Sequence, residues 1–140
     1  MLARRGERIL ASAAVVVLDR SLSTLTYATA GHPPPVLIDP DGTVTLLDAA
    51  NRAWLGVAAS RPIEVVLPFP IGTQLVLYTD GLVERRNRTF DEAIGEMITV
   101  LASHHTLDQP DQLIDLILDT LIGDGSHGDD IAVLIVKHVG

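Results

Sequence analysis

The sequence contains no cysteine, few aromatic residues and no long apolar run. None of its 140 residues is Cys, and only 4% are aromatic. Without cysteine, neither a disulfide framework nor a thiolate metal site can form, so a bound metal ion must take oxygen or imidazole ligands. The longest apolar run, residues 13–18, is much shorter than the roughly 20 residues that a membrane-spanning helix needs. We therefore expect no membrane partner.

Basic residues are scarce as well. Lys and Arg number 10 against 18 Asp and Glu, which gives a formal net charge of −8. This balance argues against a nucleic-acid partner, because neutralising phosphates requires clustered Lys and Arg. The hydrophobic fraction of 47% is typical of a globular protein and too high for intrinsic disorder. A chain of this length fits a single domain, residues 1–140.

The first 18 residues have a superficial likeness to a signal peptide. Three arginines precede an apolar stretch, residues 9–18. That stretch is Val-rich, however, and runs into Asp19-Arg20 without a small-residue cleavage site. We interpret it as a β-strand and expect a cytoplasmic protein.

The N-terminal half has the pattern of antiparallel β-structure. Three pairs of β-prone segments are separated by turn-forming residues: 13–18 with 22–28, 36–38 with 44–47, and 63–67 with 74–79. The middle pair flanks Asp39-Pro40-Asp41-Gly42, in which Pro at the second position and Gly at the fourth favour a type I turn. The pattern predicts three hairpins.

The C-terminal half changes to helical periodicity. Thr89 and Glu92 have the spacing of a capping box, which predicts a helix over about 91–102. Asp108 is a candidate N-cap for a second helix, whose apolar stripe ends near Gly123. A final strand, 131–136, follows. The overall pattern is that of an α+β domain with a helical hairpin between strands.

Two acidic segments stand apart from this pattern. Asp80 follows the predicted strand 74–79, and Asp129-Asp130 precede the strand 131–136. If these strands are neighbours in one sheet, Asp80 and Asp129 converge on one point. Converging carboxylates repel one another unless a cation neutralises them. Hard oxygen ligands favour Mg²⁺ or Mn²⁺.

Each of these residues also has a simpler interpretation. Asp before Gly is a common turn former, so either acidic segment alone is better explained as a solvated loop. His32 is better explained as a turn residue than as a substrate contact. Arg85 and Arg86 either attract a phosphorylated substrate or form a solvated charge run. Trp54, the single tryptophan, is interpreted as a core residue.

Four motifs in chain order carry a resemblance to a known family. They are Tyr-Ala-Thr-Ala-Gly-His-Pro-Pro-Pro at 27–35, Leu-Gly-Val at 55–57, Leu-Tyr-Thr-Asp-Gly-Leu-Val-Glu at 77–84 and Gly-Asp-Asp-Ile-Ala-Val-Leu at 128–134. Together they resemble the C-terminal half of a SpoIIE-like (RsbU-like) phosphatase domain. This is a bacterial branch of the metal-dependent PPM protein serine/threonine phosphatases. The resemblance covers about residues 8–136.

The resemblance implies a fold and a chemistry. The fold would be an antiparallel β-sandwich flanked by helices, with a two-metal centre of Mn²⁺ or Mg²⁺. Asp80 and Asp129 would be the catalytic metal ligands, with Asp130 at the adjoining position, and His32, Arg85 and Arg86 are candidates for binding substrate. Water activated by the metal would hydrolyse phosphoserine or phosphothreonine. Usual substrates in this branch are phosphorylated anti-anti-sigma factors, so a regulatory protein of that type is the expected partner.

The chain also departs from the family pattern. These phosphatases carry, in their N-terminal half, a Gly-Asp-x-x-Gly-x-Gly type motif whose Asp bridges the two metals. Neither Glu7 nor Asp19, the early acidic residues, is followed by that glycine pattern. We therefore expect weak binding of the second ion, together with exposed sheet edges and apolar faces. Three alternatives stay open: an active phosphatase, a catalytically inactive truncated or pseudophosphatase module acting in protein–protein regulation, and a homodimer whose neighbour covers the exposed edge.

Overall fold

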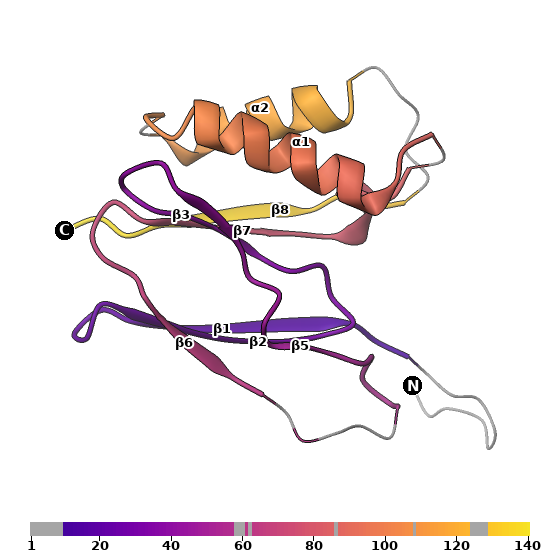
Figure 1. Ribbon diagram of the computed structural model, residues 1–140, viewed down its shortest axis with the longest axis horizontal. Coiled ribbons are helices and arrows are strands. Elements are labelled where there is room, and N and C mark those ends of the chain that lie inside the picture. The colour runs from indigo at the N-terminus through magenta and orange to yellow at the C-terminus, as the bar shows by residue number, and fades with distance from the viewer. Residues whose placement is uncertain (1–9, 58–60, 62, 86, 108, 124–128) are drawn as a thin grey trace. The chain divides into compact units, whose positions relative to one another are not determined.

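The structure is a computed structural model that describes residues 10–57, 61, 63–85, 87–107, 109–123 and 129–140. It contains two four-stranded sheets and two α-helices in these residues (Figure 1). Each sheet belongs to its own compact unit. Unit 1 comprises Met1–Pro34 and Asp48–Phe69, and unit 2 comprises Pro35–Leu47 and Pro70–Gly140. In the part of the chain that is described, no helix is long and apolar enough to span a membrane.

The sheet of unit 1 is organised around one central strand. This strand, β2 (Thr24–Ala30), pairs antiparallel with β1 (Ala13–Asp19) and β6 (Val65–Pro68), and parallel with the two-residue β5 (Asn51–Arg52). The β1–β2 hairpin confirms the first predicted pair. In its turn, the Asp19 carboxylate accepts hydrogen bonds from the backbone N–H groups of Ser21 and Leu22, at 2.9 and 3.0 Å.

The two faces of this sheet differ in exposure. Val17 and Val66 both lie opposite Thr26 in the strand register, so they share a face. They are 60% and 59% exposed, whereas Leu25 and Tyr27, which alternate to the other face of β2, are buried. The expectation of an exposed apolar face is therefore confirmed for the described residues of unit 1.

The sheet of unit 2 is antiparallel throughout. Its strands are ordered β4 (Val44–Leu46), β3 (Val36–Ile38), β7 (Gln74–Tyr78) and β8 (Val133–Lys137). The predicted β3–β4 hairpin is confirmed, and the N–H of Gly42 donates to the Asp39 carbonyl across its turn at 2.9 Å, as a type I turn requires.

Two helices cover one face of the unit 2 sheet, α1 (Phe90–Ser103) and α2 (Pro110–Leu121) (Figure 1). The predicted capping box begins α1: the N–H of Thr89 donates to Glu92 Oε2 and the N–H of Glu92 donates to Thr89 Oγ1, at 2.8 and 3.2 Å. Gln109 takes the N-cap position of α2, and Asp108, the predicted cap, lies outside the described residues.

Apolar side chains from the two helices and the sheet form one core. Their spacing of three and four residues along each helix directs them to one face. The fully buried helical members are Ala93, Met97, Leu101, Leu113, Ile117 and Leu121, and the strand members include Val36, Ile38 and Val76.

The third predicted hairpin is wrong. Strand β6 pairs with β2 in unit 1, whereas β7 pairs with β3 and β8 in unit 2. The residues that connect β6 to β7 are already divided between the two units. The N–H of Phe69 donates to the Ser23 carbonyl of unit 1, and the N–H of Gly72 donates to the His138 carbonyl of unit 2. A short apolar strand carries no signal that selects its partner, so adjacency in sequence was misleading here. The parallel β5 likewise contradicts an all-antiparallel N-terminal half.

Candidate active site

The ends of two neighbouring strands bring the acidic segments together. Strands β7 and β8 run antiparallel, and Tyr78, the last residue of β7, lies opposite Val133, the first residue of β8. The ladder extends one step further, because the N–H of Thr79 donates to the Ala132 carbonyl at 3.0 Å. The sequence predicted that Asp80 and Asp129 converge if their strands are neighbours in one sheet, and β7 and β8 are neighbours. Asp80 follows one strand and Asp129-Asp130 precede the other at the same end of the pair.

The Thr79 side chain ties the two segments together. Its hydroxyl donates to the Asp130 carbonyl at 3.2 Å and accepts from the N–H of Ala132 at 2.9 Å. A hydroxyl can donate one hydrogen bond and accept others, so both contacts are satisfied at once. Sequence analysis missed this residue. The available signal was a β-branched hydroxyl residue between the end of a strand and the acidic Asp80.

Gly81 allows the closest approach between the same segments. A Cβ atom at Gly81 would overlap the Asp130 carbonyl oxygen and lie 3.3 Å from the Asp129 carbonyl carbon. Its φ is not in the left-handed region, so the requirement for glycine is steric rather than conformational. Gly81 is buried, and the Asp130 carbonyl occupies the space that a side chain at position 81 would need.

The two carboxylates are oriented by their own loops. Asp80 begins a short 3₁₀ turn, η1 (Asp80–Leu82), and its Oδ1 accepts from the N–H of Gly81 at 2.9 Å. Asp129 Oδ1 accepts from the N–H of Asp130 at 2.8 Å. Within the described ranges, no three His, Asp or Glu side chains gather closely enough to hold a metal ion. His127 lies outside the described residues.

The donor chemistry of this end of the sheet fits a hard divalent cation. Carboxylate oxygens are the donors that Mg²⁺ and Mn²⁺ prefer. The absence of a Cβ at Gly81 keeps the two acidic backbones in contact. Asp80 is half-buried, whereas Asp129 and Asp130 are exposed. Both segments thus carry carboxylate oxygens of the kind that such a cation would take.

Arg85, one of the predicted substrate-binding arginines, follows this turn. Arg85 Nη1 donates to the Ile122 carbonyl at 2.9 Å, which connects the segment after η1 to the C-terminal end of α2. Arg88 forms an ion pair with Glu96 at 2.7 Å. Both arginines line an open pocket of about 420 Å³ together with Glu84 and Phe90. Arg86 lies outside the described residues.

His32 belongs to unit 1, unlike the acidic residues. Its Nδ1 lies 3.2 Å from the hydroxyl of Ser12, with which it forms a hydrogen bond. This contact joins His32 to a side chain 20 positions away rather than to the backbone of its own turn, and the role of His32 toward substrate stays a prediction.

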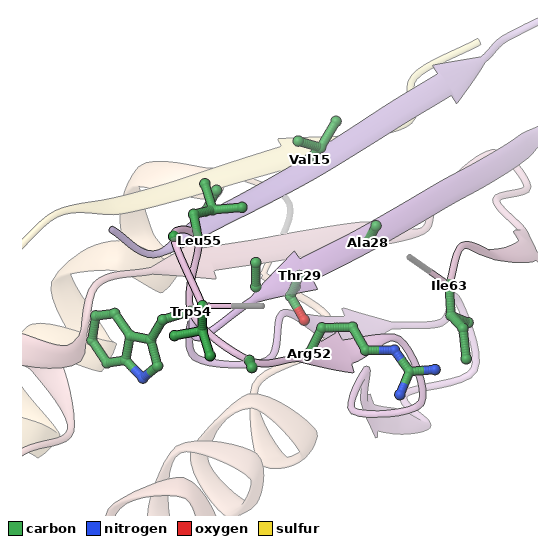
Figure 2. A pocket seen from close by; sticks show the side chains of 12 residues that line it. Val15, Ala28, Thr29, Arg52, Trp54, Leu55 and Ile63 are labelled. Carbon is green, nitrogen blue, oxygen red and sulfur yellow. The ribbon is translucent and has the colours of Figure 1, made fainter. Parts of the chain in front are cut away.

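A second pocket, of about 350 Å³, lies in unit 1 (Figure 2). Its lining is almost entirely apolar and contains none of the predicted site residues. Trp54 contributes to it and is 45% exposed, so its assignment to the core is wrong. The indole instead lies against Gly31, whose φ of +58° and missing Cβ make room for the ring.

Comparison with known proteins identifies the family. The family model described as Stage II sporulation protein E (SpoIIE) matches residues 1–139. This chain belongs to the SpoIIE family. Protein IcfG of Synechocystis sp. is 30% identical over 128 residues, which cover 86% of this chain and 19% of that protein.

Solved structures share the fold of this chain. The structure of the RsbU and RsbW domains of Rv1364c from Mycobacterium tuberculosis matches with a TM-score of 0.81 and 28% identity, covering 90% of this chain and 35% of that one. The SpoIIE phosphatase domain of Bacillus subtilis matches with a TM-score of 0.68 and 18% identity, covering 93% and 57%. The SiaA-PP2C domain of Pseudomonas aeruginosa gives 0.70 and 22%, covering 90% and 51%.

These matches confirm the predicted SpoIIE-like resemblance and the PPM-like α+β fold class. At 18% and 22% identity, the B. subtilis and P. aeruginosa structures support the fold alone. The chain spans 19% of the curated SpoIIE-family relative and 35–57% of the three solved chains.

Proposed function

We propose that this chain supplies metal-binding residues to a SpoIIE-type protein serine/threonine phosphatase. The observation that carries the proposal is the pairing of β7 with β8, which puts Asp80 and Asp129 at one end of the sheet in a member of a phosphatase-domain family. Asp80 and Asp129 would bind Mn²⁺ or Mg²⁺, with Asp130 at the adjoining position. Membership in a family with metal-dependent phosphatase neighbours supports this choice.

The proposed reaction is hydrolysis of a phosphoserine or phosphothreonine ester. A bond forms between the water oxygen and phosphorus, the bond between phosphorus and the side-chain oxygen breaks, and a proton passes to the released hydroxyl. A bound divalent cation would supply charge stabilisation and lower the pKa of water. Asp80 and Asp129 would hold that ion through their carboxylates. Arg85, fixed by its hydrogen bond to the Ile122 carbonyl, and Arg86 and His32 are proposed to attract the phosphorylated substrate.

The proposed substrate is a phosphorylated regulatory protein of the anti-anti-sigma type. The similarity to a chain that joins RsbU and RsbW domains supports a regulatory protein as partner. Such a partner places the proposed activity in the cytoplasm. A homodimer is a second way to complete the site, with a neighbouring copy adding ligands.

The test is Mn²⁺-dependent hydrolysis of a phosphoserine peptide by the purified chain. Asp80→Asn should abolish turnover and weaken Mn²⁺ binding while leaving the metal-free fold nearly unchanged. Asp115→Asn makes the same charge change on the exposed face of α2 and serves as the matched control. Equal Mn²⁺ affinity in Asp80→Asn and the original chain would remove the proposed site. Mn²⁺ binding that depends on Asp80, without turnover, would instead favour a non-catalytic regulatory module.

A further inference from the structure

We propose that Thr79 is the positioning residue of the acidic site, through its hydroxyl rather than its methyl group. The inference rests on the proposed function, because it assigns a role toward the metal bound by Asp80 and Asp129. It concerns a side chain that lies between the strand and the first of these ligands. Thr79 itself is not proposed to touch the metal or the substrate.

The first argument is where the β7–β8 ladder ends. Backbone pairing runs from Gln74 opposite Lys137 to Tyr78 opposite Val133, and the last backbone bond joins Thr79 to Ala132. Beyond that point the chain turns into η1, so the backbone of Asp80 cannot continue the ladder. The position of Asp129-Asp130 relative to Asp80 is therefore not fixed by further hydrogen bonds of this ladder.

The second argument is that the Thr79 hydroxyl forms two hydrogen bonds to the opposite segment where the ladder ends. It accepts from the N–H of Ala132 at 2.9 Å and donates to the carbonyl of Asp130 at 3.2 Å. The hydroxyl thus holds two backbone groups, one of them belonging to the predicted ligand residue Asp130. A valine at this position has the same shape but leaves both groups without this partner.

The third argument is convergence on one atom. The Asp130 carbonyl oxygen that accepts from Thr79 is also the atom that a Cβ on Gly81 would overlap. The Thr79 hydroxyl and the missing Cβ of Gly81, one on each side of Asp80, therefore both bear on the position of the same carbonyl. Because Asp129 immediately precedes that group, the spacing between the Asp80 and Asp129 backbones is set by residues 79 and 81. Partners outside the ligand shell of this kind typically contribute about 10- to 100-fold to metal affinity.

The experiment compares Mn²⁺ affinity and thermal stability in a set of Thr79 variants. By calorimetric titration of the full chain, Thr79→Val should weaken Mn²⁺ binding roughly tenfold or more, and Thr79→Ser, which keeps the hydroxyl, should retain the original affinity. Thr45→Val makes the same change at the exposed middle position of strand β4 in the same unit and should leave the affinity unchanged. The melting temperature of each metal-free variant is measured in parallel.

The outcomes separate this inference from the proposed function. Mn²⁺ binding that is lost in Asp80→Asn but retained in Thr79→Val would overturn the role of Thr79 and leave the site standing. Weak binding by folded Thr79→Ser would assign the effect to the methyl group and also overturn it. If Thr79→Val does not fold while Thr79→Ser does, the hydroxyl supports the fold itself, which equally contradicts a positioning role. No Mn²⁺ binding by the original chain would overturn the proposed site and the inference together.

Discussion

Both units contain sheets with apolar strands, but the sheet faces differ in how much apolar surface is exposed. Strand β1 of unit 1 is as rich in valine as the strands of unit 2, yet Val15 and Val17 are each 60% exposed. In unit 2, α1 and α2 cover one face of the sheet, and Val36 and Val76 are completely buried. Strand composition therefore indicates that a segment pairs in a sheet, whereas coverage of a face depends on elements that lie elsewhere in the chain.

The largest expected difference between the units is in the effect of deleting an apolar side chain. Leu121→Ala should lower the free energy of unfolding by about 2–5 kcal/mol, because it leaves a cavity in the helix–sheet core; the residue is only 2% exposed. Val15→Ala, at an exposed site, should change it by less than about 0.5 kcal/mol. Urea denaturation of both variants measures the contrast. A large loss in Val15→Ala would show that its face is covered in solution.

The next effect contrasts two glycines of unit 2. Gly81→Ala should destabilise the chain by about 1–3 kcal/mol, because backbone atoms of Asp130 occupy the space of the new methyl group. Gly95→Ala, which meets no atom within 4 Å on α1, should stabilise it by roughly 0.5–1 kcal/mol through helix propensity. Thermal unfolding should show a lower melting temperature for Gly81→Ala and a higher one for Gly95→Ala. A neutral Gly81→Ala would contradict the close approach of the acidic segments.

The two tyrosines report separately on the units, Tyr27 on unit 1 and Tyr78 on unit 2. Burial raises the pKa of both phenols above 10.0, and backbone groups of Ala49 and Ala50 partly offset the pKa shift at Tyr27. Tyr78 has the larger pKa shift, so phenolate absorbance in alkali should appear first from Tyr27. Tyr27→Phe should remove that first step.

The same tyrosines predict how stability depends on alkaline pH. A group whose pKa is raised in the folded state binds its proton more tightly there than in the unfolded chain. The stabilising contribution is therefore complete below the unfolded pKa of 10.0 and is lost as pH rises toward the folded value. Urea midpoints between pH 9 and 11, roughly spanning the unfolded pKa, should fall less steeply in Tyr78→Phe. An unchanged slope would contradict the burial of this phenol in solution.

The smallest expected effect concerns one aspartate in a hairpin turn of each unit, and we expect the same result in both units. Asp19 in the β1–β2 turn and Asp41 in the β3–β4 turn both have pKa values lowered below 3.8, the first mainly by the Ser21 hydroxyl and the second mainly by the backbone N–H of Thr43. A lowered pKa stabilises the fold above the unfolded value, and this contribution is lost as pH falls through the folded value. Asp19→Asn and Asp41→Asn should each slightly flatten the acid dependence of the urea midpoint. If only one of the two variants changed the acid dependence of the urea midpoint, the two turns would not contribute alike, contrary to this prediction.

Local elements were predictable because their signals lie within a few residues. The capping box of Thr89 and Glu92 places the start of α1 within one residue of the predicted position, since both hydrogen bonds join neighbours in the chain. The turn at Asp39–Gly42 was predictable for the same reason. The convergence of Asp80 with Asp129 was expected only on condition that two strands pair, and sequence spacing alone could not establish that pairing.

Features that depend on distant segments were missed or predicted wrongly. Strand β6 was assigned to β7, its neighbour in sequence, because four apolar residues do not specify a partner. Trp54 was assigned to the core from its residue type, but its ring lies over Gly31 and remains 45% exposed. Thr79 was overlooked because its two partners, Asp130 and Ala132, are more than 50 positions away in the chain.

The amino-acid sequence by itself determined two of the three predicted hairpins, the two helices, the family and the acidic residues that could bind a metal. These follow from short-range hydrogen bonding, periodicity and motifs in a fixed order. The tertiary structure decided which strands are neighbours, which valines stay exposed, and that Thr79 and Gly81 contact one carbonyl of Asp130. The physical reason is that pairing and coverage between distant segments are selected by the packing of the whole unit, which no single stretch of sequence contains.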